Sequence, residues 1–239
     1  MTTAGGHNRA MPSTILDLTH HLRAGNSASP RLTWYGPDGE RVELSGRVLD
    51  NWVAKTSNFL SEELDAGRGT RVRLDLPPHW KSVVIALATL QTGAVLVDTA
   101  PADITFTGPE SHDGEAGGGV RVAVALGALE MAYPGELPAG ALDYAALVRQ
   151  FADSYEPFDP PVEGDPAVDG QHTFTQTELF SRFAVPAADG ARVLVAGSSG
   201  LMDALARLIG AWSAGGSAVL AHPGIDDVEH LRRVENVTA

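Results

Sequence analysis

The sequence predicts an α/β fold: a mostly parallel sheet with helices on both faces and an N-terminal β-hairpin. The stretch 71–98 contains a short apolar strand, an apolar helix that ends at Gly93 and a second apolar strand. Such a βαβ unit places both strands parallel in one sheet, with helices packed against it. Residues 36–39, Gly-Pro-Asp-Gly, separate two further short strands and predict the hairpin.

Two threonine or serine residues stand where helix N-caps belong. Ser45 precedes an amphipathic helix that runs to Gly67, and Thr175 precedes a helix at 178–183. The other predicted elements are helices at 13–24, 143–151, 201–212 and 226–234, and strands at 31–35, 41–44, 103–107, 120–126, 192–196 and 217–221.

The predicted elements fall into two lobes. Residues 1–12 are expected to form a disordered tail, and 13–155 an α/β lobe with an exposed Gly- and acid-rich loop at 108–119. Residues 156–172 are rich in proline and acids and are expected to form a linker over the surface. A smaller α/β lobe at 173–239 is expected to pack on the first.

The composition excludes several classes of protein. The 239 residues are 44% hydrophobic and carry a formal net charge of −13, which argues against a nucleic acid or an anionic membrane surface as partner. The absence of cysteine excludes disulfides, thiolate zinc sites and cysteine nucleophiles. Neither a secretion signal nor an apolar run of membrane-spanning length is visible, so the expected location is the cytoplasm.

A turn at 197–200 is the best candidate ligand site. Gly197, Ser198, Ser199 and Gly200 lie between a strand and a helix, where backbone N–H groups and the helix dipole favour a phosphate or a carboxylate. The alternative is that these residues only form the turn and cap the helix. A hydrolase nucleophile elbow needs glycine two residues before and two residues after the serine, and here Ala196 and Leu201 each fill one of those places, so neither serine qualifies. Ser199 and His222 are weak catalytic candidates, on the assumption that the two strand ends are neighbours.

Nucleotide and metal motifs are not found. No G-x-G-x-x-G follows a strand, and no G-x-x-x-x-G-K-[ST] occurs. The two lysines, Lys55 and Lys81, both lie in predicted helices. His20 and His21 are adjacent and would point about 100° apart on a helix, so they cannot share a metal ion. No metal site is therefore expected.

Four segments, in this order, resemble the N-terminal half of the adenylate-forming enzymes, the superfamily of acyl-CoA synthetases, luciferases and peptide-synthetase adenylation domains. They read VELSGRVLDNWVAKTSNFLSEEL at 42–64, GTRVRLDLPPHWKSVVIALATLQTGAVLVD at 69–98, GDPAVDG followed by TFTQTELF at 164–180, and RVLVAGSSGLMDALARLIGAWSAGGSAVL at 192–220. The resemblance implies the fold of half an adenylation domain. The chain looks like short actinobacterial proteins of this truncated form, and 15 Arg against 2 Lys suits a high-GC source.

The departures from the family bear on function. The family's Ser/Thr/Gly-rich loop, which ends in lysine and holds the ATP phosphates, should lie between Asp165 and Thr173. The residues there are PAVDGQH, with one glycine and no Ser, Thr or Lys. The family's ribose-binding aspartate and its C-terminal lobe with the catalytic lysine have no counterpart. Because adenylation depends on aligning and neutralising phosphates, neither ATP nor AMP is expected to bind, and no cofactor is expected.

Three functional readings follow. The first is a non-catalytic relative of the adenylate-forming enzymes that binds a small molecule or a protein partner. It is expected to form a homodimer, or to have a partner over surface that is internal in the family. The second is a residual acyl or nucleotide transferase that uses the 197–200 turn. The third is a regulatory subunit of a separate adenylation enzyme. A pocket with converging polar groups at the turn would favour the enzyme.

Overall fold

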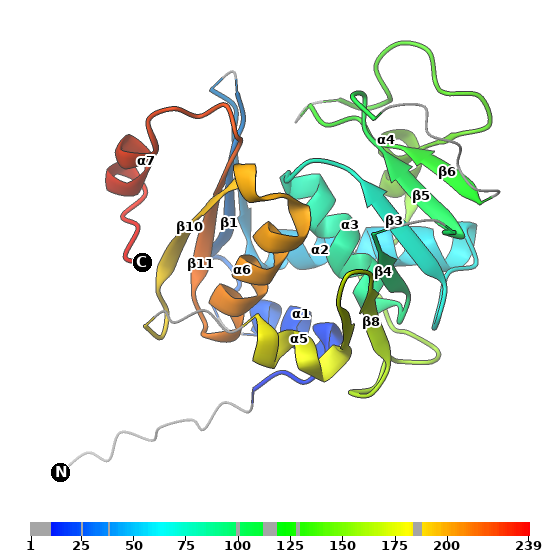
Figure 1. Cartoon of the computed structure of the whole chain (residues 1–239), viewed down its shortest axis with the longest axis horizontal. Coiled ribbons are helices and arrows are strands. Elements are labelled where there is room, and N and C mark those ends of the chain that lie inside the picture. The colour runs from blue at the N-terminus through cyan, green and yellow to red at the C-terminus, as the bar shows by residue number, and fades with distance from the viewer. Residues whose placement is uncertain are drawn as a thin grey trace.

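The computed structural model describes residues 11–24, 26–37, 39–98, 101–111, 119–127, 130–183 and 188–239. Most of the expected tail at 1–12 and of the expected loop at 108–119 lies outside these ranges. Within them, no helix is both long enough and apolar enough to cross a membrane. The predicted α/β class is confirmed (Figure 1).

Eleven strands in the described part of the chain form two sheets. They are β1 (Pro30–Tyr35), β2 (Arg41–Ser45), β3 (Arg71–Asp75), β4 (Val95–Val97), β5 (Ile104–Thr107), β6 (Val120–Ala123), β7 (Leu142–Asp143), β8 (Pro166–Asp169), β9 (Thr173–Thr175), β10 (Arg192–Ala196) and β11 (Ser217–Ala221). The larger sheet has the order β7-β6-β5-β3-β4-β8-β9, and the smaller has the order β10-β11-β1-β2. All neighbouring strands are parallel except the pairs β8–β9 and β1–β2.

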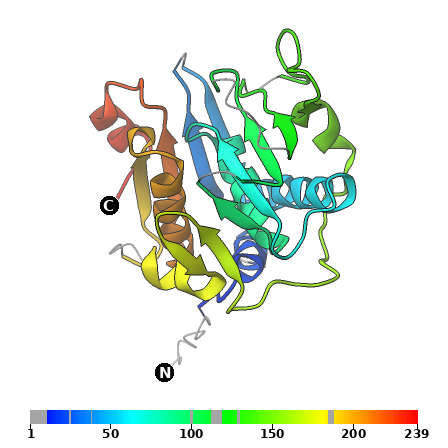
Figure 2. The same ribbon diagram turned by 45° about the vertical axis from the view of Figure 1, so that its right-hand side comes forward.

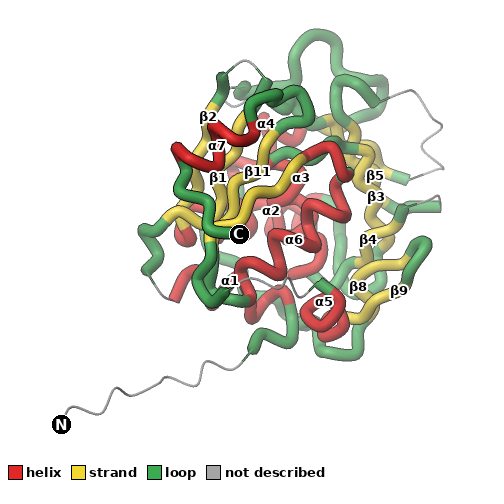
Figure 3. The backbone as a smooth tube through the Cα atoms, turned by 60° about the vertical axis from the view of Figure 1, so that its left-hand side comes forward, coloured by secondary structure: helices red, strands yellow, loops and turns green. Residues whose placement is uncertain are grey.

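Four helices form a layer between the two sheets (Figures 1 and 3). The helices of the described residues are α1 (Ile15–Ala24), α2 (Gly46–Asn58), α3 (Trp80–Gln91), α4 (Tyr144–Leu147), α5 (Gln176–Arg182), α6 (Leu201–Ser213) and α7 (Val228–Val234). The central layer consists of α1, α2, α3 and α6. A single apolar core therefore runs from Phe106 on the larger sheet to Trp34 on the smaller one, and both side chains are at most 1% exposed.

The central βαβ unit forms as predicted. β3 and β4 are parallel neighbours, and all twelve residues of α3 between them are buried. A helix that is apolar on every side is stable only when neighbours cover every side, and the two sheets and the adjoining helices do so here. This burial explains why α3 is less amphipathic than α2.

Both predicted N-caps are present. The Ser45 hydroxyl accepts a hydrogen bond from the backbone N–H of Val48 at the start of α2. Thr175 forms a capping box with Glu178 at the start of α5, each side chain accepting from the other residue's backbone N–H. These local hydrogen bonds satisfy amide groups that the first turn of a helix leaves unpaired.

The structure differs from the prediction in the number of sheets. The sequence predicts one sheet with helices on both faces, whereas the chain builds two sheets around a shared helix layer. In the expected smaller lobe, β11 pairs with β1 of the hairpin, β10 pairs with β11, and β9 extends the larger sheet. Residues 13–155 and 173–239 thus contribute strands to both sheets.

The expected linker at 156–172 also differs from the prediction over its last third. Pro166–Asp169 forms β8, which pairs in parallel with β4 and buries Ala167 and Val168. The proline stands at the first position of the strand, where the missing N–H is tolerated. The sequence prediction missed β8 because acidic residues and prolines surround this short strand.

Candidate ligand-binding site

The connection between β8 and β9 occupies the position at which the resemblance places the phosphate-binding loop. It consists of Gly170, Gln171 and His172. The backbone N–H of Gln171 donates to Oδ2 of Asp98 at 2.9 Å. A Cβ on Gly170 would lie 2.3 Å from the same oxygen, so a larger residue here would displace the Asp98 side chain. The turn is therefore folded onto a carboxylate, which accepts the hydrogen bond of the Gln171 amide.

An ion pair holds the strand that enters this turn. Nη1 of Arg71 on β3 lies 2.8 Å from Oδ2 of Asp169 at the end of β8. This hydrogen bond lowers the pKa of Asp169. Asp169 is thus kept as an anion at the end of β8, directly before the turn.

The predicted turn at 197–200 forms as a strand-to-helix connection. Gly197–Ser199 makes one turn of 3-10 helix, and Gly200, with φ +88°, precedes α6. A Cβ on Gly197 would lie 2.7 Å from the carbonyl oxygen of Ala221, so the close approach of β11 requires glycine here. No side chain caps the start of α6. The N-terminal amide groups of this helix are consequently a local source of positive potential.

The two weak catalytic candidates make hydrogen bonds to the backbone. β10 and β11 are parallel neighbours that end together, with Ala196 opposite Ala221, as the hypothesis assumed. The Ser199 hydroxyl donates to the carbonyl oxygen of Ala196 at 3.1 Å. Nδ1 of His222 accepts from the backbone N–H of Gly224 at 3.0 Å. Each side chain thus bonds within its own local turn, and among the residues that the structure describes no base is hydrogen-bonded to Ser199.

A cleft of about 610 Å³ opens where α6 begins; we call it the α6 cleft. It lies at the carboxyl ends of β3, β4 and β8, where open parallel sheets bind their ligands. The residues that line it are Arg73, Leu74, Asp75, Leu96, Val97, Asp98, Val168, Gly170, Gln171, His172, Phe174, Leu201 and Met202. None of the four residues of the predicted turn at 197–200 is in this lining, which includes only Leu201 and Met202, the two residues that follow the turn.

Arg73 is the main cation of the α6 cleft. Its side chain is half-buried, and its Nε is buried without a hydrogen-bond partner among the described residues. Sequence reasoning missed this residue because it alternates with apolar residues in β3 and resembles an ordinary solvent-facing strand position. The signal that could have found it is its place near the carboxyl end of a parallel strand. Within the described ranges, no group of three or more His, Asp or Glu side chains is arranged to hold a metal ion.

Comparison with known proteins agrees with this architecture. No protein-family model matches the chain. A Mycobacterium tuberculosis protein described as a TIGR03089 family protein is 37% identical over 145 residues, which are 57% of this chain and 59% of the relative. The chain thus spans about three-fifths of that relative's length. The match supports the expected actinobacterial affinity.

Solved structures show where the fold belongs. A Brucella canis acyl-CoA synthetase superimposes with a TM-score of 0.70 and 17% identity over 93% of this chain and 45% of its own. The acetoacetyl-CoA synthetase of Streptomyces lividans has a TM-score of 0.68 and 19% identity, and the match covers 92% of this chain and 40% of the synthetase. The N-terminal domain of FACL13 from Mycobacterium tuberculosis has a TM-score of 0.68 and 14% identity, and the match covers 94% of this chain and 61% of that domain. The chain has the fold of adenylate-forming enzymes over about half of their length, as the resemblance predicts.

Proposed function

We propose that this protein is a non-catalytic relative of the adenylate-forming enzymes that binds a small carboxylic acid with an apolar body in the α6 cleft. The observation that carries the proposal is that the first residues of α6, whose start has no side-chain cap, and Arg73, whose Nε has no partner among the described residues, line the same cleft. Both features favour an anion. The apolar wall, which includes Leu96, Val168 and Phe174, suits the body of the acid.

The geometry supports binding without ATP-dependent chemistry. The β8–β9 turn provides no phosphate cradle, and its amide at Gln171 is already bonded to Asp98. Ser199 and His222 each bond to nearby backbone atoms. The hypothesis of a transferase requires a hydrogen bond between Ser199 and His222, and these backbone contacts do not support one.

Isothermal titration of the purified protein with hexanoate, AMP and Mg-ATP tests the proposal. We expect hexanoate to bind and neither nucleotide to bind measurably. Met202→Glu places a negative charge in the first turn of α6, where it suits the helix dipole but repels a carboxylate. We expect this variant to keep its stability and to bind hexanoate about tenfold more weakly, whereas Met202→Gln binds nearly as the parent does. The proposal would be contradicted if hexanoate did not bind, if Met202→Glu and Met202→Gln bound hexanoate equally well, or if Mg-ATP bound tightly.

A homodimer in the cytoplasm remains part of the proposal. The apolar side chains of Phe158 and Val162 are exposed. Exposed apolar side chains of this kind support a partner that covers them. Light scattering of the purified protein measures the mass directly. A monomeric mass would remove the dimer from the proposal and leave the ligand site untouched.

A further inference from the structure

A second cleft of about 610 Å³ lies beside the β1–β2 hairpin; we call it the hairpin cleft. It shares Leu74 and Asp75 with the α6 cleft and is otherwise lined by different residues. Its wall comes from the hairpin turn, the β3–α3 loop, and the segments that follow β5, β6 and β11. In Figures 1 and 2 the hairpin tip and the loops near β5 and β6 lie along one edge of the molecule. Like the first cleft, it stands at carboxyl ends of parallel strands.

Two polar atoms in this wall lack partners among the described residues. Nε1 of Trp34, a side chain 1% exposed, donates no hydrogen bond, and Oε1 of Glu40 accepts none. Oε2 of Glu40 and Nε1 of Trp34 lie 2.7 and 3.3 Å from the point where a Cβ on Gly36 would sit. The indole N–H of Trp34 and the carboxylate of Glu40 therefore both lie beside Gly36. Leaving such groups unpaired in a buried position is costly, so they point to a ligand that pairs with both.

Two histidines flank the indole with a defined tautomer. The ring of Trp34 makes edge contacts with those of His79 at 4.8 Å and His222 at 6.1 Å. Nδ1 of His79 accepts from the backbone N–H of Lys81, and Nδ1 of His222 accepts from that of Gly224. The neutral form of either ring would therefore carry its proton on Nε2. Burial, together with the nearby charges of Lys81 and His222, lowers the pKa of His79 to about 3, so this ring stays neutral.

The charges around the cleft favour a cation. Glu40, Asp75 and Glu110 line it, and no lysine or arginine is among the described residues of its wall. The neighbouring Lys81 is buried and close enough to Glu40 to interact with it electrostatically, but its Nζ donates to the carbonyl oxygens of Ala125 and Gly127 at 2.6 and 2.7 Å. Its charge is thus engaged by backbone oxygens.

We propose that the hairpin cleft binds a small amino alcohol, in which an ammonium group and a hydroxyl stand on neighbouring carbons of an apolar body. The ammonium donates to the carboxylate of Glu40. The hydroxyl oxygen accepts from the indole N–H of Trp34, which lies beside Gly36 as that carboxylate does. The body packs on Leu76 and Leu126, both in the wall. This site is independent of the carboxylic acid proposed for the α6 cleft.

Titration with 2-amino-1-phenylethanol tests the assignment. Phenethylamine lacks the hydroxyl, and mandelate replaces the ammonium group by a carboxylate. We expect the amino alcohol to bind about tenfold more tightly than phenethylamine, and mandelate not to bind. Glu40→Gln keeps the shape of the side chain and removes its charge, and we expect it to weaken the amino alcohol at least tenfold. Glu43→Gln is the matched control, since Glu43 of the same hairpin pairs with Arg41 and does not line the cleft.

Trp34→Phe separates the hydrogen bond from packing. This variant removes the N–H, so the amino alcohol should lose its advantage over phenethylamine while phenethylamine itself binds as before. Met202→Glu should leave both amines unaffected, and Glu40→Gln should leave hexanoate unaffected, which distinguishes the two sites. Three results would overturn the assignment: no binding of the amino alcohol, equal affinity for the parent and Glu40→Gln, or binding of mandelate as tight as that of the amine.

Discussion

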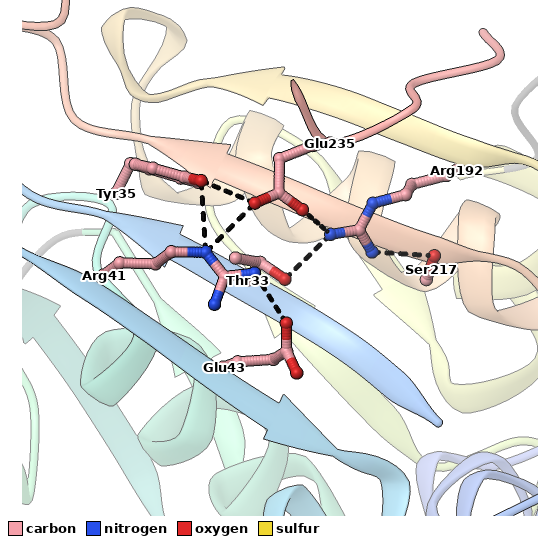
Figure 4. A network of polar contacts seen from close by, with 7 residues as sticks. All are labelled: Thr33, Tyr35, Arg41, Glu43, Arg192, Ser217 and Glu235. Carbon is pink, nitrogen blue, oxygen red and sulfur yellow. Dashed lines mark hydrogen bonds and ion pairs between the residues drawn. The ribbon is translucent and has the colours of Figure 1, made fainter. Parts of the chain in front are cut away.

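At the scale of single residues, Glu235 fastens the C-terminal segment to the smaller sheet (Figure 4). Its carboxylate accepts from the Tyr35 hydroxyl at 2.5 Å, from Nε of Arg41 at 3.0 Å, and from the guanidinium of Arg192. Burial opposes ionisation, but these hydrogen bonds outweigh it and lower the pKa of Glu235. Because the folded-state pKa lies below the unfolded value, the stabilisation is present at neutral pH. It is lost as the pH falls below about 4.5 and through the folded-state pKa.

Glu235→Gln should therefore cost about 1–3 kcal/mol at pH 7 and flatten the fall in stability at acid pH. Thermal unfolding followed by circular dichroism from pH 3 to about pH 7 measures both effects. Glu229→Gln is the control, because Glu229 is exposed and its ion pair with Arg232 spans 3.7 Å. We expect the control to change stability by less than about 0.5 kcal/mol. An unchanged pH profile in Glu235→Gln would show that this carboxylate is not a source of acid sensitivity.

At the scale of elements, one face of α2 and of the helical turn that follows it, Phe59–Glu63, contacts the chain at residues 151–155. Lys55, Asn58 and Ser61 are spaced three residues apart, so their side chains share a face of the helix. Nζ of Lys55 donates to the carbonyl oxygen of Phe151 at 2.6 Å, and the Ser61 hydroxyl lies 3.2 Å from that of Tyr155. Nδ2 of Asn58 donates to two carbonyl oxygens in residues 152–154 at 3.0 and 2.9 Å. This segment carries no regular structure between 151 and 165, and α2 gives it a fixed path.

Asn58→Ala leaves both of those carbonyl oxygens without their donor. We expect it to destabilise the fold by about 1–3 kcal/mol and to speed proteolytic cleavage within residues 151–165. Limited proteolysis with mass spectrometry locates the cleavage, and Asn51→Ala on the same helix, which is half-buried and makes no hydrogen bond that we identify, is the control. Equal cleavage of the two variants would mean that the segment is held by other contacts.

At the scale of the whole molecule, the hairpin joins the two halves of the chain. β1 lies between β2 and β11, and Trp212 on α6 reaches back to donate from Nε1 to the carbonyl oxygen of Arg31 at 2.9 Å. Trp212 is 1% exposed in the core shared by both sheets. The two expected lobes therefore have one core, and such a structure should unfold as one unit.

Trp212→Ala tests this cooperativity. Removal of the buried ring should cost about 3–5 kcal/mol and lower the melting temperature in one transition. Circular dichroism and tryptophan fluorescence should give coincident curves, because residues 13–155 and 173–239 lose their structure together. Val234→Ala, at a half-exposed position on α7, is the control and should change little. Two separated transitions would show that the lobes are energetically independent.

The elements that the sequence predicted are those with local causes. The caps at Ser45 and Thr175 and the βαβ unit at 71–98 are confirmed because hydrogen bonding within a turn and the spacing of apolar residues are written in adjacent positions. The turn at 197–200 is likewise found between a strand and a helix. The prediction that no Ser/Thr/Gly-rich loop lies between Asp165 and Thr173 also rests on adjacent residues.

Long-range pairing was decided only by the tertiary structure. β1 pairs with β11 across the length of the chain, and β8 joins a sheet although prolines and acids surround it. No local pattern records which strands become neighbours, because the periodicity of a strand reports burial and not its partner. Both clefts arise from this pairing: it brings Arg73 to the start of α6, and Glu40 and Trp34 to the histidines at the ends of distant elements. The sequence by itself thus determined the elements with local causes, while the assembly of two sheets around one helix layer determined where the clefts lie.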